Sequence, residues 1–115
     1  MIKLAHLQDL MHTHHFVPQA IVGESVFSLA KRVGFELEKG EDDLDNYCGA
    51  AAILNERVPF AVIHYQGHPE DTSTIYLPLK ITNVEEITKL IFEIVGELKL
   101  EQKSLLWQRK DDPDL

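Results

Sequence analysis

The chain has 115 residues, of which 44% are hydrophobic, and its 19 acidic and 11 basic side chains give a formal net charge of −8. This length and composition predict a single globular domain over residues 1–115. The acidic balance argues against direct binding to nucleic acid or to an anionic membrane, because both need clustered Lys and Arg side chains. Two explanations of the acidity remain: solubility, which is the simpler, and a basic partner protein.

Cysteine usage and hydropathy indicate the compartment. Cys48 is the only cysteine, so the sequence offers no internal disulfide and no thiolate cage for a metal. The N-terminus lacks the long apolar core of a signal peptide, and no apolar run approaches the roughly 20 residues of a membrane span. We therefore expect a cytoplasmic protein that uses no cofactor.

The first third of the chain predicts short elements. Apolar residues at helical spacing favour an amphipathic helix within 2–13, and a connector containing a proline and a glycine follows at 15–23. Ser25 is a suitable N-cap for a helix over 26–33, which a glycine then ends. Alternating residues at 35–38 predict a first strand.

The centre of the sequence carries the strongest β-strand pattern. After a polar loop at 40–46, two apolar runs at 48–54 and 58–65 flank a short loop and predict a hairpin. Residues 72–77 alternate between apolar and polar side chains and predict another strand. The simplest arrangement of these strands is an antiparallel meander.

The C-terminal part predicts one long helix and one strand. Thr82 and Glu85 match a capping box, in which each side chain bonds the backbone N–H of the other residue. Apolar residues then keep helical spacing as far as Leu98. A last strand is expected within 104–110, and the polar tail at 111–115 is expected to fray.

These elements predict an α+β fold. We expect a small antiparallel β-meander of about three to five strands, with one or two short N-terminal helices. The C-terminal amphipathic helix should cover one face of the sheet, because the sheet is the only large apolar surface available to it. Negative side chains then lie outside, and little room is left for an elaborate catalytic interior.

Histidines near the N-terminus are the first candidate site. His12, His14 and His15 lie close together, with His6 upstream, and imidazole is the commonest metal-ligating side chain. No HExxH pattern is present, and His12 and His14 point about 200° apart on a helix. We interpret the stretch as a solvated helix end rather than a metal site.

The segment 64–72 is the densest cluster of functional groups beside a predicted strand end. A histidine near a carboxylate is the minimal acid–base pair, and two histidines with a carboxylate can hold a metal. The candidate binding residues are His64, Tyr65, His68, Asp71 and Thr72. The simpler interpretation is a tight turn built on a glycine and a proline.

An acidic stretch forms a third candidate site, for docking a basic partner. Its candidate residues are Glu41, Asp42, Asp43 and Asp45, and the stretch holds no calcium-loop pattern. Complementary charge of this kind mainly raises association rate and specificity. The simpler interpretation is a solvated loop.

Trp107 and Arg109 form the last candidate, since Trp and Arg are enriched at interface hot spots. At strand spacing the two side chains point the same way, although a lone Trp more often caps a core. A strand at this edge could instead pair with its symmetry mate in a homodimer. Cys48 begins an apolar run, which predicts a buried, inert thiol.

No catalytic signature is present, so the leading hypothesis is a non-enzymatic interaction module. Such a protein would act as an accessory, inhibitory, antitoxin-like or immunity-like partner that binds another protein through its acidic face. The alternative is a small ligand-binding or metal-assisted enzyme domain that uses the 64–72 turn. A third possibility is a site shared between subunits of an oligomer.

Overall fold

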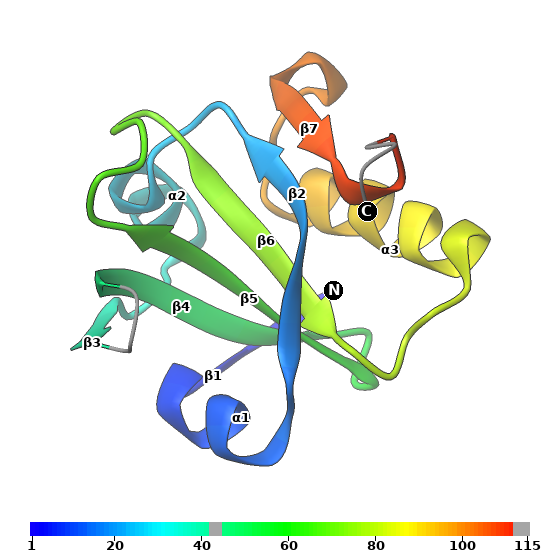
Figure 1. The fold of residues 1–115 in the computed structure, drawn as a ribbon, viewed down its shortest axis with the longest axis horizontal. Coiled ribbons are helices and arrows are strands. Elements are labelled where there is room, and N and C mark those ends of the chain that lie inside the picture. The colour runs from blue at the N-terminus through cyan, green and yellow to red at the C-terminus, as the bar shows by residue number, and fades with distance from the viewer. Residues whose placement is uncertain (42–44, 112–115) are drawn as a thin grey trace.

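The computed structural model describes residues 1–41 and 45–111, which form three α-helices and one seven-stranded sheet (Figure 1). The helices are α1 (Leu7–Thr13), α2 (Val26–Val33) and α3 (Val84–Glu97). The strands are β1 (Ile2–Ala5), β2 (Phe16–Val22), β3 (Glu38–Glu41), β4 (Asn46–Leu54), β5 (Val58–Tyr65), β6 (Ser73–Pro78) and β7 (Leu105–Gln108). Two short 3-10 helices, η1 (Gln102–Ser104) and η2 (Arg109–Asp111), flank β7. The α+β class is confirmed.

The sheet is larger than the sequence suggested. Its strands run in the order β1-β4-β5-β6-β2-β7, with β3 pairing beside β4, and every pair is antiparallel. The predicted meander is its centre, β4-β5-β6. The predicted range of about three to five strands was too small because β1 and β2, which were not predicted, join the sheet through partners more than 45 residues away.

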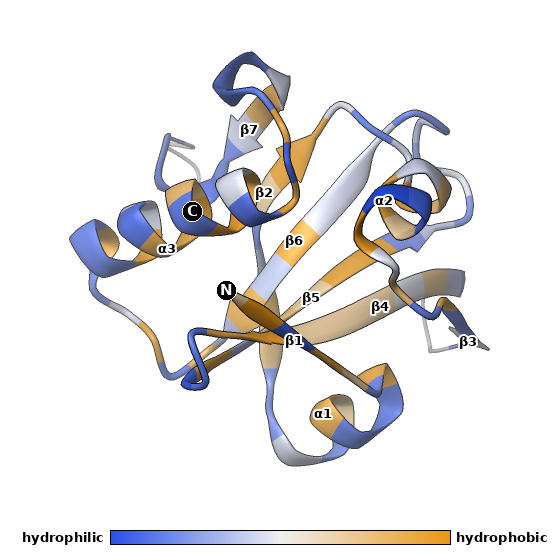
Figure 2. Ribbon diagram, turned by 180° about the vertical axis from the view of Figure 1, so that it is seen from behind, coloured by the Kyte–Doolittle hydropathy of each residue, from blue (hydrophilic) through white to orange (hydrophobic). Residues whose placement is uncertain are grey.

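One face of the sheet carries the main core. Alternate residues of β2, β4, β5 and β6 point to this face and pack against α2 and α3, which lie on the near side of the sheet in Figure 2. Leu29 of α2, Ile94 of α3 and Phe60 of β5 are all fully buried in this core. The prediction that one helix covers this face was therefore incomplete, since α2 and α3 share it.

The amphipathic stripe of α3 is confirmed, with Leu90, Ile91 and Ile94 buried. The predicted capping box is wrong by one residue. Asn83, not Thr82, is the N-cap, and its side chain accepts a hydrogen bond from the Glu86 N–H at 2.9 Å. For α2 the expectation is confirmed, because the Ser25 hydroxyl accepts from the Ser28 N–H at 3.1 Å.

The N-terminal predictions needed the largest corrections. The expected helix over 2–13 is β1 followed by the shorter α1, because β1 pairs with residues 51–54 of β4. The expected connector at 15–23 is the strand β2. Pro18 is tolerated there because it lies beside a bulge, where β2 pairs with β6 but not with β7.

Two smaller corrections concern strand bounds. The strand expected at 35–38 begins only at Glu38, while Phe35 is buried in the core. The last strand ends at Gln108, so Arg109 belongs to η2 and does not share the strand alternation of Trp107. Most of the tail expected to fray lies outside the described residues. No helix in the described segments has both the length and the apolarity needed to cross a bilayer.

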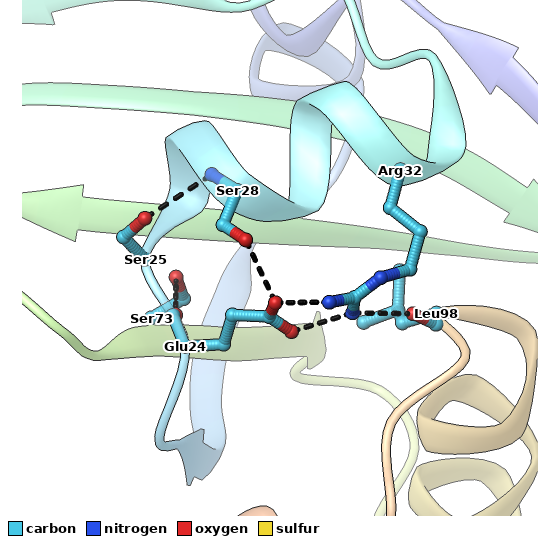
Figure 3. Close-up of polar contacts among 6 residues, drawn as sticks. All are labelled: Glu24, Ser25, Ser28, Arg32, Ser73 and Leu98. Carbon is cyan, nitrogen blue, oxygen red and sulfur yellow. Dashed lines mark hydrogen bonds and ion pairs between the residues drawn. The ribbon is translucent and has the colours of Figure 1, made fainter.

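A polar network joins α2 to α3 and β6 at the rim of the core (Figure 3). The Arg32 guanidinium forms an ion pair with the Glu24 carboxylate and reaches the Leu98 carbonyl at 3.4 Å. The Ser28 hydroxyl donates to the same carboxylate at 2.7 Å, and the Ser73 hydroxyl donates to the Glu24 carbonyl at 2.7 Å. The network ties the two helices that cover the main core.

This network predicts a pH-dependent stability. The hydrogen bonds from Arg32 lower the pKa of Glu24, against the opposing effect of burial, and Ser28 adds to the lowering. A carboxylate with a depressed pKa stabilises the fold above its unfolded-state value and loses that contribution as the pH falls through its folded value. Glu24→Gln should therefore lower the thermal midpoint near neutral pH, with a deficit that shrinks in acid.

Thermal melts of the wild type and Glu24→Gln at several pH values measure this. Glu101→Gln is the control, because Glu101 pairs with Lys103 at 3.0 Å on a fully solvated part of the surface. An equal deficit for Glu24→Gln at every pH would contradict the assignment.

Candidate functional site

The second face of the sheet holds an open cleft. It occupies about 770 Å³ between the C-terminal end of α1, the start of β2 and the turn that joins β5 to β6. Its apolar and aromatic lining comprises Met11, Phe16, Pro18, Ile63, Tyr65 and Tyr76. Its polar lining comprises His14, His15, Asp45, Gln66 and His68. We call this the tyrosine cleft.

The cleft exists because α1 covers only part of this face. Leu7 of α1 is fully buried against the cross-strand pair Ala51 and Ala61, whose small side chains leave room for the helix. Beyond α1, the larger side chains of Tyr65 and Tyr76 lie half-buried along β5 and β6. The cleft is the part of the face that the short helix does not reach.

Two side chains fix α1 in place beside the cleft. The Glu38 carboxylate accepts hydrogen bonds from the Leu7 and Gln8 backbone N–H groups, at the helix end where a negative charge is favourable. The Tyr47 hydroxyl accepts from the Gln8 side chain at 2.8 Å and contacts the Met11 sulfur at 3.7 Å. The Glu38 carboxylate, close to the acidic stretch in sequence, thus stabilises α1 and is not available to a partner.

Asp45 lines the cleft just before β4, and its carboxylate accepts a hydrogen bond from the Asn46 N–H at 2.8 Å. The Asn46 carbonyl accepts from the Gln66 N–H at 2.9 Å, and the Asn46 side chain donates to the Gln66 side chain at 3.2 Å. Tyr65 lies beside these contacts, with its ring 5.6 Å from that of Tyr47 and 6.0 Å from that of His68. The rim therefore combines one carboxylate with several aromatic rings.

The segment 64–72 is a turn held by its own hydrogen bonds. The His64 Nδ1 lies 3.0 Å from the Thr72 carbonyl, and Nδ1 must carry the proton because a carbonyl only accepts. The Thr72 hydroxyl donates to the Pro69 carbonyl at 2.7 Å, and the His68 N–H donates to the Tyr65 carbonyl at 3.1 Å. Among the described residues, Asp71 has no hydrogen bond or ion pair with either histidine.

A second cleft of about 860 Å³ lies on the other side of this turn. Cys48 and His64 are register partners on β4 and β5, and Lys39 is the register partner of Cys48 on β3. Burial raises the pKa of the Cys48 thiol, and the nearby Lys39 charge opposes this only in part. Cys48 is partly exposed rather than buried as predicted, and its raised pKa keeps it a weak nucleophile.

The sequence-predicted residues fall into separate places. Tyr65, His68 and Asp45 line the tyrosine cleft, while His64, His68 and Glu41 line the second cleft. Trp107 is half-buried on β7, opposite Ile21 of β2, and Arg109 lines a different groove. Asp42 and Asp43 lie outside the described residues.

Sequence reasoning missed Phe16, Pro18 and Tyr76 as site residues. The only available signal was the alternation of β6, which correctly placed Tyr76 opposite the core face. For Phe16 and Pro18 the sequence offered no alternation to follow, because their strand was not predicted. Two of the N-terminal histidines, His14 and His15, do line the cleft. However, no three His, Cys, Asp or Glu side chains in the described segments converge as a metal site requires.

Comparisons with known proteins identify no family for this chain. No protein-family model matches the sequence. No curated protein and no solved structure shows significant similarity to it either. The function must therefore be argued from the clefts themselves.

The internal bonding of the 64–72 turn leads to a prediction. His64→Ala removes the bond to the Thr72 carbonyl and should cost about 1 kcal/mol of unfolding free energy, the usual contribution of one hydrogen bond. His68→Ala, whose side chain lies at the mouth of both clefts, should cost less than half as much. Urea denaturation of the two variants measures the difference. An unchanged stability for His64→Ala would mean that the bond has no structural role.

Proposed function

We propose that this protein is a non-enzymatic interaction module that binds a basic segment of a partner protein in the tyrosine cleft. The observation that carries the proposal is the composition of the cleft. Aromatic rings, three histidines and one carboxylate line it, and no Lys or Arg is among its described lining residues. This fits a guest that carries Lys or Arg side chains.

Aromatic faces and carboxylates attract the same guests. A Lys or Arg head group over the face of a tyrosine gains about 0.5 to 2 kcal/mol, depending on how dry the site is. In this cleft Tyr65 and Tyr76 offer the rings, and Asp45 offers the counter-charge at the rim. The net charge of −8 adds a long-range attraction that raises the association rate of a cation.

The remaining acidic candidates support the same partner less directly. Glu41 belongs to β3, close to the start of β4, where Asp45 also lies. Glu38 is engaged in binding the end of α1. We therefore assign the specific contacts with the basic segment to the tyrosine cleft. The surrounding acidic residues add only a long-range electrostatic attraction.

A second candidate function is small-ligand binding beside His64. It is favoured by the second cleft, whose volume of about 860 Å³ lies in the usual range for small-molecule sites and which brings Cys48 next to His64. The His64→Ala variant separates the candidates. Loss of a bound metal or ligand without loss of stability would favour this second function.

Titration calorimetry with a short arginine-rich peptide tests the proposed function. Tyr76→Leu keeps an apolar side chain but removes the ring face, and we expect it to weaken binding about tenfold, on the scale of a cation–π contact in a hot spot. Tyr76→Phe keeps the ring face and should bind nearly as well as the wild type. Asp45→Asn should also weaken binding and reduce its salt dependence.

Glu101→Gln is the charge-matched control for Asp45→Asn, because it removes the same charge at a residue that does not line the cleft. The two variants should differ clearly in affinity. Equal weakening by both would show that only net charge attracts the peptide, and the tyrosine cleft would then not be the binding site.

A further inference from the structure

The outward face of α3 and the segment before it carry large apolar side chains that stay exposed among the described residues. Phe92 is 64% exposed and Val84 is 57% exposed, while Leu79, just before the helix, is 52% exposed. Single exposed apolar residues are ordinary on protein surfaces. These three are notable because they line connected grooves.

Two grooves meet at the N-terminal half of α3. One, of about 590 Å³, is lined by Val84, Phe92 and Lys110. The other, of about 340 Å³, is lined by Leu79, Val84 and Lys110. Because Val84 and Lys110 belong to both, the grooves form one continuous surface, which we call the α3 groove. The segment η2, red in Figure 1, contributes Lys110 beside α3.

The charge of the α3 groove is opposite to that of the whole chain. Lys89, Arg109 and Lys110 line it, and Glu85 is the one carboxylate among its described lining residues. None of the three cations forms an ion pair with a described carboxylate, in contrast to Arg32 with Glu24. The described lining of the groove thus carries more cations than carboxylates, in a protein of net charge −8.

From these exposed apolar side chains and the excess of cations in the described lining, we infer that the α3 groove docks an acidic amphipathic segment of a partner protein. Such a segment lays an apolar stripe on Phe92 and Val84, as amphipathic helices do in hydrophobic grooves. Its Asp and Glu side chains then lie near Lys89, Arg109 and Lys110, where charge complementarity fixes register and speeds association. This inference does not depend on the function proposed for the tyrosine cleft.

Charge and shape favour a protein segment over other anionic partners. An anionic membrane would repel the rest of this acidic chain. A nucleic acid presents phosphates but no apolar stripe for Phe92 to contact. A second copy of the chain is negatively charged as well, but its association would appear as a dimer in solution.

A designed acidic amphipathic helix, labelled for fluorescence anisotropy, is the probe. Phe92→Ala and Lys89→Glu should each weaken its binding about tenfold, as expected for hot-spot side chains. The matched controls are Phe27→Ala and Lys31→Glu, which change an exposed Phe and an exposed Lys on α2. Both controls should bind within about twofold of the wild type.

Several results would overturn the inference. They are the absence of binding by the wild type, equal weakening by the α2 controls, and equal binding of a peptide with Lys in place of each Glu. Vesicle co-sedimentation with anionic lipid and sedimentation velocity without peptide complete the test. Vesicle binding that Phe92→Ala abolishes would show a membrane site instead, and a dimer that Phe92→Ala disrupts would show a self-association surface.

Discussion

Burial of one sheet face beneath α2 and α3 is the constraint on which the other features depend. Leu29 and Ile94 are buried in the same core cluster as Phe60, and at its rim Arg32 of α2, paired with Glu24, reaches the Leu98 carbonyl at the end of α3. Because side chains alternate along every strand, filling this face turns the intervening residues to the other side. On that side α1 is the only helix that packs among residues 1–41 and 45–111, so the tyrosine cleft follows from covering one face fully and the other in part.

The two candidate surfaces differ in sign and in origin. The tyrosine cleft arises from strand alternation and gathers rings and a carboxylate at the ends of β4 and β5. The α3 groove arises from helix periodicity, since burying Ile91 and Ile94 turns Phe92 outward. The two proposals together give the protein one surface for a basic segment and another for an acidic segment. Holding both partners at once is the accessory role that we propose.

The sequence was informative where structure is local. The caps and stripe of α2 and the β4–β5 hairpin depend on residues close in the chain, and their patterns were read correctly. β1 and β2 depend on partners far along the chain. Pro18 has the sequence pattern of a strand breaker, but the bulge beside it lets β2 continue. The candidate site was only partly predictable for the same reason. Tyr65, His68 and Asp45 were named. The alternation of β6 placed Tyr76 on the correct face, but its meeting with Phe16 in the cleft depends on the pairing of β2 with β6, which no local pattern reports.

The unequal covering of the two faces is tested most directly by comparing Ile94→Ala with Leu10→Ala in urea denaturation. Ile94 is fully buried between α3 and the sheet, whereas Leu10 is a half-buried residue of α1. We expect Ile94→Ala to cost about 2 to 5 kcal/mol of unfolding free energy, as for other fully buried aliphatic residues, and Leu10→Ala to cost less than half as much. An equal or larger cost for Leu10→Ala would show that the main core lies on the α1 side, and would contradict the account.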